Sequence, residues 1–339
     1  MNLKYPNQHD MSKTHFFIKI VLLLCTVSIS AQVQRTRLVT LMGSRFQITL
    51  VDKDSLSAEK NIDKAIDEIT RIENLISEWR PETQISQVNK NAGIQPVKVD
   101  PEVFKLTQKA LYFSEITDGA FDISIVAMDK IWKFDDSMNE LPGEQAIKES
   151  VRNVGYHNIV LDGTNATIFL KKQGMKIGFG SIGKGYAADQ ARELMKSYGV
   201  KSGIIDASGD ISTWGTQPDG KPWAIGINNP FNSHKMAAIL YFTENSVTTS
   251  GSYEKYAEIN GKRYSHIMNP KTGYPSTGLT SVTVTGPNAT MANGFSTSIM
   301  VLGEKDGLKL IKKFPEYHYL FITDKGKIIK DLKYKPLRH

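Results

Sequence analysis

Four glycines and a lysine lie close together at residues 178–185, in a pattern that can hold a phosphate group. Gly178, Gly180 and Gly183 allow the backbone to approach a ligand closely, because glycine has no Cβ. A helical pattern follows, and the first turn of a helix offers free N–H groups to an anion. Lys184 adds a mobile positive charge. The segment therefore predicts a phosphate-binding turn between a short strand and a helix.

Two nucleotide-binding motifs overlap in this segment. Its first three glycines match the G-x-G-x-x-G of dinucleotide-binding folds, and Asp206 lies where an acid that binds ribose would be expected. The segment also begins like a P-loop, but Gly185 lacks the hydroxyl with which a P-loop holds Mg²⁺. Taken alone, the segment leaves two structures open: the dinucleotide turn of an NAD(P)-dependent dehydrogenase, and a tight turn without a ligand.

Three further segments carry polar side chains that could do chemistry. His266 lies at the end of an expected strand, just before a loop rich in proline and glycine, where functional side chains are common. Asn293 and Thr297 are four residues apart in an expected helix, so both point to one side of it. Residues 117–122 predict a turn at Asp118 and Gly119.

The elements that must position these residues mix helices and hairpins without regular alternation. Helices are predicted at 57–78, 100–117, 144–154, 184–198, 290–302 and 304–314. Hairpins are predicted at 37–51, at 158–179 and about Lys325-Gly326, with further strands between 203 and 286. Since long antiparallel hairpins dominate, the sequence predicts an α+β fold of mixed, largely antiparallel sheets with packed helices, rather than a doubly wound sheet.

The first residues predict a signal peptide. Two lysines precede an apolar run at 20–27 that is too short to span a membrane, and small residues up to Ala31 end it. We expect a signal peptide at 1–31 and one large domain at 32–339, with an uncleaved N-terminal anchor as the alternative. The sole cysteine, Cys25, lies inside the apolar run, so the mature protein would have no disulfide, cysteine nucleophile or cysteine metal site.

Charge narrows the choice of partners. The chain has 42 Lys and Arg against 35 Asp and Glu, a formal net charge of +7. The lysines are scattered, without a long basic run or an aromatic-basic pattern, so we expect no nucleic-acid binding. A mild positive balance suits an anionic ligand. An exported enzyme without cysteine fits the bacterial periplasm or cell surface.

Six segments in one order resemble the ApbE family of FAD:protein FMN transferases. They are 117–122, 180–189, 208–210, 249–251, 265–275 and 293–297. Each segment is modest alone, whereas the ordered set is highly specific and the resemblance covers roughly 35–310. It implies an ApbE-like, T-fold-related single domain. It also implies an enzyme that binds FAD, splits its pyrophosphate with Mg²⁺, transfers FMN to a threonine hydroxyl of a target protein and releases AMP.

The resemblance also implies roles for single residues. Lys184 and the glycines would hold the phosphates, and His266 would be the base for the target hydroxyl. Mg²⁺ would be held by Asn293, Thr297 and the carbonyl of Ala187. The residues expected to line the FAD site are Met42, Trp79, Ala120, Phe121, Asp122, Lys184, Gln190 and Ile267.

The chain departs from the family where acids are usual. Asn293 stands in place of an aspartate, and Gly178, Ser252 and Asn269 stand where acids are frequent. Because a neutral amide brings no charge to Mg²⁺, we expect weaker metal binding. The alternative function is that of a periplasmic FAD-binding protein or FAD pyrophosphatase without transferase activity.

The resemblance also sets the expected partners and place of action. They are FAD and an exported acceptor flavodomain with a target threonine, such as a redox-pump subunit. The expected location is the periplasm or the periplasmic face of the inner membrane. The sequence specifies no oligomeric state.

Overall fold

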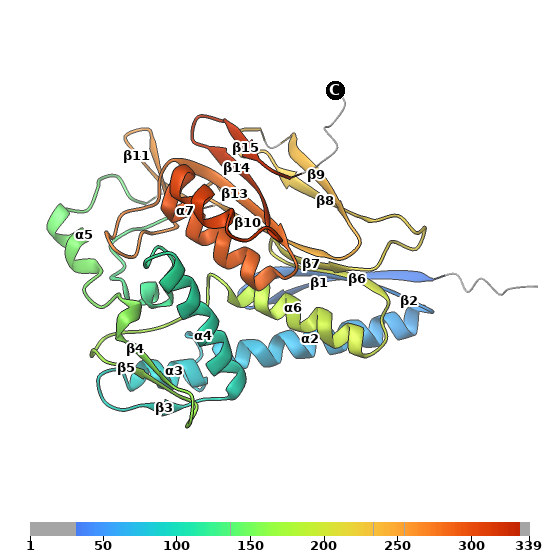
Figure 1. Cartoon of the computed structure of the whole chain (residues 1–339), viewed down its shortest axis with the longest axis horizontal. Helices are drawn as coiled ribbons and strands as arrows, with labels where there is room; N and C mark the ends of the chain where they lie inside the picture. Colours follow the sequence, from blue (N-terminus) through green and yellow to red (C-terminus); the bar gives the residue numbers. More distant parts are fainter. Residues whose placement is uncertain (1–31, 136, 233, 254, 333–339) are drawn as a thin grey trace, which may run out of the picture. The chain divides into compact units, whose positions relative to one another are not determined.

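An eight-stranded sheet forms the centre of the computed structural model, which describes residues 32–135, 137–232, 234–253 and 255–332 (Figure 1). The strand order is β1-β2-β6-β7-β10-β13-β14-β15, and every neighbouring pair is antiparallel. The strands are β1 (Val33–Leu41), β2 (Ser44–Asp52), β6 (Ser202–Ala207), β7 (Asp210–Trp214), β10 (Asn245–Gly251), β13 (Leu279–Gly286), β14 (His318–Thr323) and β15 (Ile328–Lys330). The predicted α+β class is confirmed, and the doubly wound alternative is excluded.

Three helices cover one face of this sheet (Figure 1). Helix α2 (Ser55–Ile76) packs on β1 and β2, α6 (Gly183–Ser197) on β6 and β7, and α7 (Ala289–Ile311) on β10 and β13. Isoleucines at helical spacing form the buried stripe of α2, as its amphipathic pattern predicts. The sequence therefore orients each helix through one apolar face.

The hairpin of β8 (Trp223–Asn228) and β9 (Met236–Phe242) covers part of the opposite face. Its Ile225 and Leu240 pack in one buried cluster with Val247 of β10. Thr248, the next residue of β10, is directed to the helices, since its hydroxyl donates to the Ala289 carbonyl at 3.5 Å. Because side chains alternate along a strand, the two layers lie on opposite sides of β10.

A second group of elements packs beside the sheet and helices. It contains the three-stranded sheet of β3 (Val97–Lys98), β5 (Thr167–Leu170) and β4 (Ile159–Asp162), the hairpin of β11 (Tyr256–Ile259) and β12 (Lys262–Ser265), and the helices α3 (Gln84–Lys90), α4 (Pro101–Ile116), η1 (Ile123–Ala127), α5 (Glu144–Ser150) and η2 (Tyr156–Asn158). The ring of Phe113 in α4 meets that of Phe295 in α7 with centroids 5.1 Å apart. This edge-to-face contact joins α4 to the helix that carries Asn293 and Thr297.

The strand expected before the glycine cluster does not form. Residues 171–182 contain no strand, and the hairpin expected at 158–179 is limited to β4 and β5, which residues 163–166 join. The Asn89 side chain replaces a strand partner: it accepts from Ile177 N at 2.7 Å and donates to Ile177 O at 2.9 Å. Gly178 N donates to Ile123 O at 3.0 Å. The prediction was wrong because these backbone groups are satisfied by a distant side chain and a distant loop.

Helix α7 agrees with its prediction. Its helical geometry is interrupted at Gly303, whose φ is 76°, the residue between the two helices expected at 290–302 and 304–314. Asn288 caps α7 by accepting from Met291 N at 2.9 Å, so Asn293 lies inside the helix and not at its start. Gly294 is needed at its place, since an added Cβ would lie 2.3 Å from the Phe113 ring. Gly294 therefore allows the close contact between α7 and α4.

The expected signal peptide, 1–31, lies outside the described residues. Within the part of the chain that the structure describes, no helix has the length and apolar character needed to cross a membrane.

Candidate active site

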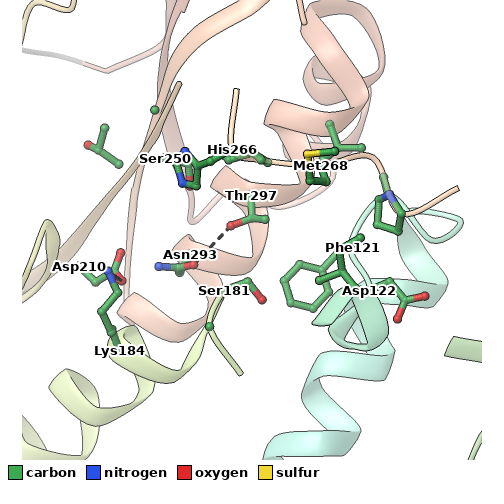
Figure 2. Close-up of a pocket in the computed structure, with 18 of the residues that line it drawn as sticks. Phe121, Asp122, Ser181, Lys184, Asp210, Ser250, His266, Met268, Asn293 and Thr297 are labelled. Atoms are coloured by element: carbon green, nitrogen blue, oxygen red, sulfur yellow. Dashed lines mark hydrogen bonds and ion pairs between the residues drawn. The ribbon is translucent and has the colours of Figure 1, made fainter. Parts of the chain in front are cut away.

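Two cavities share Gly180 and Lys184 as lining residues. The first, of about 290 Å³, contains His266 and lies between the start of α6, the η1 turn and α7; we call it the His266 cavity (Figure 2). The second, of about 500 Å³, contains Trp79 and lies between the β1–β2 turn and the end of α2; we call it the Trp79 cavity. A ligand with a phosphate at the shared residues and a group on either side would occupy both.

The glycine cluster has two different functions. Gly180 has open space where a Cβ would stand, so its backbone faces the cavities directly. At Gly178 a Cβ would lie 2.9 Å from Glu78 and Val126, and at Gly185 it would lie 2.8 Å from the Ala289 carbonyl. These two glycines serve packing, and Gly185 allows α6 to cross α7 closely. The G-x-G-x-x-G match is therefore not a dinucleotide turn, and Asp206 lies in an antiparallel hairpin.

Lys184, Asp210, Asn293 and Thr297 form one polar chain across the His266 cavity (Figure 2). Lys184 Nζ lies 3.6 Å from Asp210 Oδ2, and the nitrogen end of the Asn293 amide points toward Asp210. Thr297 Oγ1 donates to Asn293 Oδ1 at 3.5 Å. Burial raises the pKa of Asp210 to about 6, against the opposing attraction of Lys184.

His266 faces the same cavity with one ring nitrogen engaged. Its Nδ1 lies 2.8 Å from the carbonyl oxygen of Lys255, and since a carbonyl only accepts, Nδ1 carries the proton. The Nε2 atom of a neutral His266 is therefore free of a proton and able to accept one. Burial lowers the pKa of His266 below its usual value of 6.5, although the bond to Lys255 opposes this. Both properties suit a general base.

Ala120, Phe121, Asp122 and Ile267, which were expected to line the FAD site, line the His266 cavity. The Asp122 carboxylate accepts from Ser124 N at 2.8 Å and from Tyr156 N at 2.8 Å. Burial raises the pKa of Asp122, although these hydrogen bonds oppose the shift. Asp122 thus caps η1 and holds the turn that forms one wall.

The Trp79 cavity contains Met42 and Trp79, two of the residues expected to line the FAD site. Trp79 is 74% exposed, with Lys130 Nζ 4.9 Å from its ring centroid. Met42 has a φ of 50° in the tight β1–β2 turn, and Glu73 Oε2 holds its N–H at 3.0 Å. A flat aromatic ligand can stack on the open indole face.

Glu78 was missed by the sequence analysis. Its side chain is half-buried in the Trp79 cavity and fills the space beside Gly178. Gly178 is one of the positions where relatives of the resembled family often have an acid. Burial raises the pKa of Glu78. In the sequence, the only signal was that Glu78 directly precedes Trp79, a residue expected at the FAD site. The direction of the Glu78 side chain depends on how it packs against Gly178, which the sequence does not show.

Two expected site residues are not among those that line the cavities. Of the described residues, Ala187, fully buried in α6, and Gln190 line neither cavity, and the role of the Ala187 carbonyl toward Mg²⁺ stays a prediction. Ser181, which precedes α6, lines the His266 cavity. Ser252 and Asn269 bond to the backbone, at Thr280 O and Lys271 N respectively, and line neither cavity in the described chain.

The donor set of the His266 cavity fits a hard divalent cation. Asn293, Thr297 and Asp210 offer an amide, a hydroxyl and a carboxylate oxygen, which Mg²⁺ prefers over nitrogen or sulfur. The fit is supported by Asp210 Oδ2, a buried oxygen without a hydrogen-bond partner among the described residues. In the same residues no group of three or more His, Cys, Asp or Glu is placed to hold a metal. Any ion here would thus depend on neutral oxygens and one carboxylate.

Comparison with known proteins agrees with this geometry. The sequence pattern of the ApbE family matches residues 42–321. An FAD:protein FMN transferase of Klebsiella pneumoniae (strain 342) is 31% identical over 303 residues, covering 88% of this chain and 93% of the relative. One of Treponema pallidum (strain Nichols) is 31% identical over 265 residues, covering 74% of this chain and 73% of the relative.

Solved structures show the same fold. The crystal structure of the ApbE protein of Thermotoga maritima has a TM-score of 0.80 at 30% identity and covers 88% of this chain and 97% of its own. The apo crystal structure of the Pseudomonas stutzeri flavinyl transferase ApbE has a TM-score of 0.76 at 26% identity, covering 88% and 94%. The resemblance seen in six short segments thus extends to nearly the whole described fold.

Proposed function

The chain belongs to the ApbE family, and on this basis we propose that it is an FAD:protein FMN transferase. The relatives named above carry that activity in their names. The proposed reaction uses Mg²⁺, takes FMN from FAD, joins it to a threonine hydroxyl of an acceptor flavodomain and releases AMP. The observation that carries the proposal is the pair of cavities that meet at Gly180 and Lys184.

FAD matches this pair of cavities because its two large parts are joined by a pyrophosphate. Lys184 and the Gly180 backbone would hold the pyrophosphate, since they line both cavities. One ring system would stack on Trp79 beside Met42, in the open cavity. The phosphorus that reacts would then lie in the His266 cavity, within reach of its base.

The chemistry is a phosphoryl transfer in which one P–O bond forms and one breaks. The acceptor threonine oxygen attacks the phosphorus of the FMN half, and His266 Nε2 takes the hydroxyl proton. The bond between that phosphorus and the bridging oxygen breaks, and the oxygen leaves with AMP. Lys184 stabilises the negative charge that develops on the phosphates. Asn293 and Thr297 would hold Mg²⁺, which when bound neutralises pyrophosphate charge.

The proposal includes a place of action. The expected signal peptide supports export, and an exported enzyme would act in the periplasm or at the periplasmic face of the inner membrane. Its acceptor would then be an exported flavodomain, such as that of a redox-pump subunit.

The test is incubation with FAD, Mg²⁺ and an acceptor flavodomain, followed by a denaturing gel and a nucleotide assay. We expect a fluorescent acceptor band and one AMP per FMN transferred, and no band when the acceptor threonine is replaced by valine. Release of AMP without label would indicate an FAD pyrophosphatase. FAD binding with neither product would indicate a binding protein. Either result would overturn the transferase proposal.

A further inference from the structure

Asp210 is a buried carboxylate to which the proposed reaction gives no role. It is 3% exposed, and it begins β7 directly after the two-residue turn of Ser208 and Gly209. Both turn residues have positive φ, 59° and 93°, as a tight hairpin of this type requires. The turn thus places Asp210 at the wall of the His266 cavity.

Asp210 and Asn293 lie on the same wall of the His266 cavity. The oxygen of the Asn293 amide accepts from Thr297 at 3.5 Å. An amide has one donor end and one acceptor end, so the nitrogen of Asn293 is turned the other way, toward Asp210 (Figure 2). The donor end of Asn293 therefore faces the carboxylate of Asp210.

The charge of Asp210 is only partly compensated. In the described chain its Oδ2 atom accepts no hydrogen bond, and the nearest cation, Lys184 Nζ, is 3.6 Å away. Lys184 also lines both cavities and is the group placed to contact a phosphate. When phosphate draws Lys184 away, a buried carboxylate is left without a counter-charge, which is costly. A divalent cation beside Asn293 and Thr297 would supply that counter-charge.

We propose that Asp210 supplies the negative charge of the divalent-cation site, the charge that Asn293 lacks. This inference rests on the proposed function in one respect, the identification of the cation as Mg²⁺. Asp210 and Asn293 then form a pair that carries one carboxylate and one amide. Exchanging the two residues preserves the charge of the pair and keeps one carboxylate and one amide at these two positions.

The test measures Mn²⁺ binding in the absence of FAD and acceptor. Electron paramagnetic resonance reports the Mn²⁺ that remains free, from which the bound amount follows. The unchanged protein should bind one ion. Asp210→Asn should weaken binding by at least about 10-fold, the lower end for loss of a group that supports a metal site. Asn293→Asp should tighten it, because affinity follows the charge of the ligands. The exchanged double variant D210N/N293D should return to within about 3-fold of the unchanged protein.

Asp206→Asn is the matched control. Asp206 lies in the same β6–β7 hairpin and carries the same charge, but it caps Gly209 N at 2.8 Å and is not part of the cavity wall. Its replacement should leave Mn²⁺ affinity unchanged. Thermal melting of each variant reports whether it is folded.

The comparison of N293D with D210N/N293D keeps the test decisive even if D210N alone does not fold. Equal Mn²⁺ affinity in these two variants would overturn the inference, as would D210N binding like the unchanged protein. An unchanged protein without Mn²⁺ binding at millimolar concentration would also overturn it. The Mn²⁺ measurement needs neither FAD nor acceptor, so its result is independent of the FMN-transfer assay. Failure of this inference can therefore be told apart from failure of the proposed function.

Discussion

The two cavities differ in how they are built. The His266 cavity collects residues from η1, α6, β7, β10 and α7, and its Asp210 and Asn293 are buried. Asn293 is held by a hydrogen bond from Thr297, and Asp210 lies 3.6 Å from Lys184. The Trp79 cavity lies between the β1–β2 turn, the end of α2 and the segment from Phe179 to Lys184, and its Trp79 side chain is 74% exposed. The difference indicates that the His266 cavity suits the phosphate and proton chemistry, because its charged groups are held in place. The exposed Trp79 side chain suits stacking of a ring. Substitutions should therefore change the rate in the first cavity and the affinity in the second.

The sharpest way to test this division is His266→Ala. Removing the base should slow labelling by about 10²- to 10⁴-fold, the usual contribution of general base catalysis. Affinity for FAD, followed by flavin fluorescence, should change little. His318→Ala, an exposed histidine outside both cavities, is the control. A large loss of FAD affinity in the first variant would contradict the division.

Lys184→Ala tests the residue that belongs to both cavities. It should slow labelling by about 10²- to 10³-fold, as for loss of one charge-stabilising group, and it should also raise the KM for FAD. Steady-state kinetics separates the two effects. Lys176→Ala removes an exposed lysine from the same segment and should change neither. A change in kcat alone would place the phosphates outside the shared region.

Trp79→Ala should affect binding only. Loss of one stacking surface, about 1–3 kcal/mol per base, should weaken FAD affinity by roughly 10-fold while kcat at saturating FAD is kept. Trp79→Tyr retains a ring and should stay near the unchanged protein. Because Trp79 is exposed, neither variant should lower the melting temperature. A lower kcat in Trp79→Ala would show that this cavity also positions the reacting phosphorus.

The smallest effect concerns pH. Burial lowers the pKa of His266, so its neutral form, which accepts a proton, should persist below pH 6.5 and be lost as pH falls through the lowered pKa. The imidazole resonances can be titrated by NMR, with His266→Gln to assign them. We expect a midpoint below 6.5. A midpoint above 6.5 would mean that the ring is stabilised as a cation and is not poised as a base.

Much of the fold was predictable because it depends on local signals. Asp100 before Pro101 marks the start of α4, and Asp100 accepts from Glu102 N at 2.7 Å. The hairpin about Met42 and Gly43 has the positive φ values that its turn needs. By contrast, the expected strand at Ile177 fails, because its partner is the Asn89 side chain, 88 residues away.

The site divides in the same way. His266, Lys184, Asn293 and Thr297 were identified from residue types and spacing, and all of them line the His266 cavity. The Ala187 carbonyl, which the resemblance implies as a metal ligand, stays a prediction, whereas Ser181 lines the cavity and was not expected to. Glu78 and Asp210 were given no role, since nothing in their neighbours along the chain shows which way they point.

By itself, the sequence determined the helices, the hairpins, the family and most of the polar side chains of the site. These depend on periodicity, capping and turn residues, which act over a few positions. Only the tertiary structure decided that Gly185 serves a helix crossing, that Glu78 fills the space beside Gly178 and that Asp210 meets Asn293. The reason is that close packing and the balance of buried charge depend on distances in space between residues far apart in the chain.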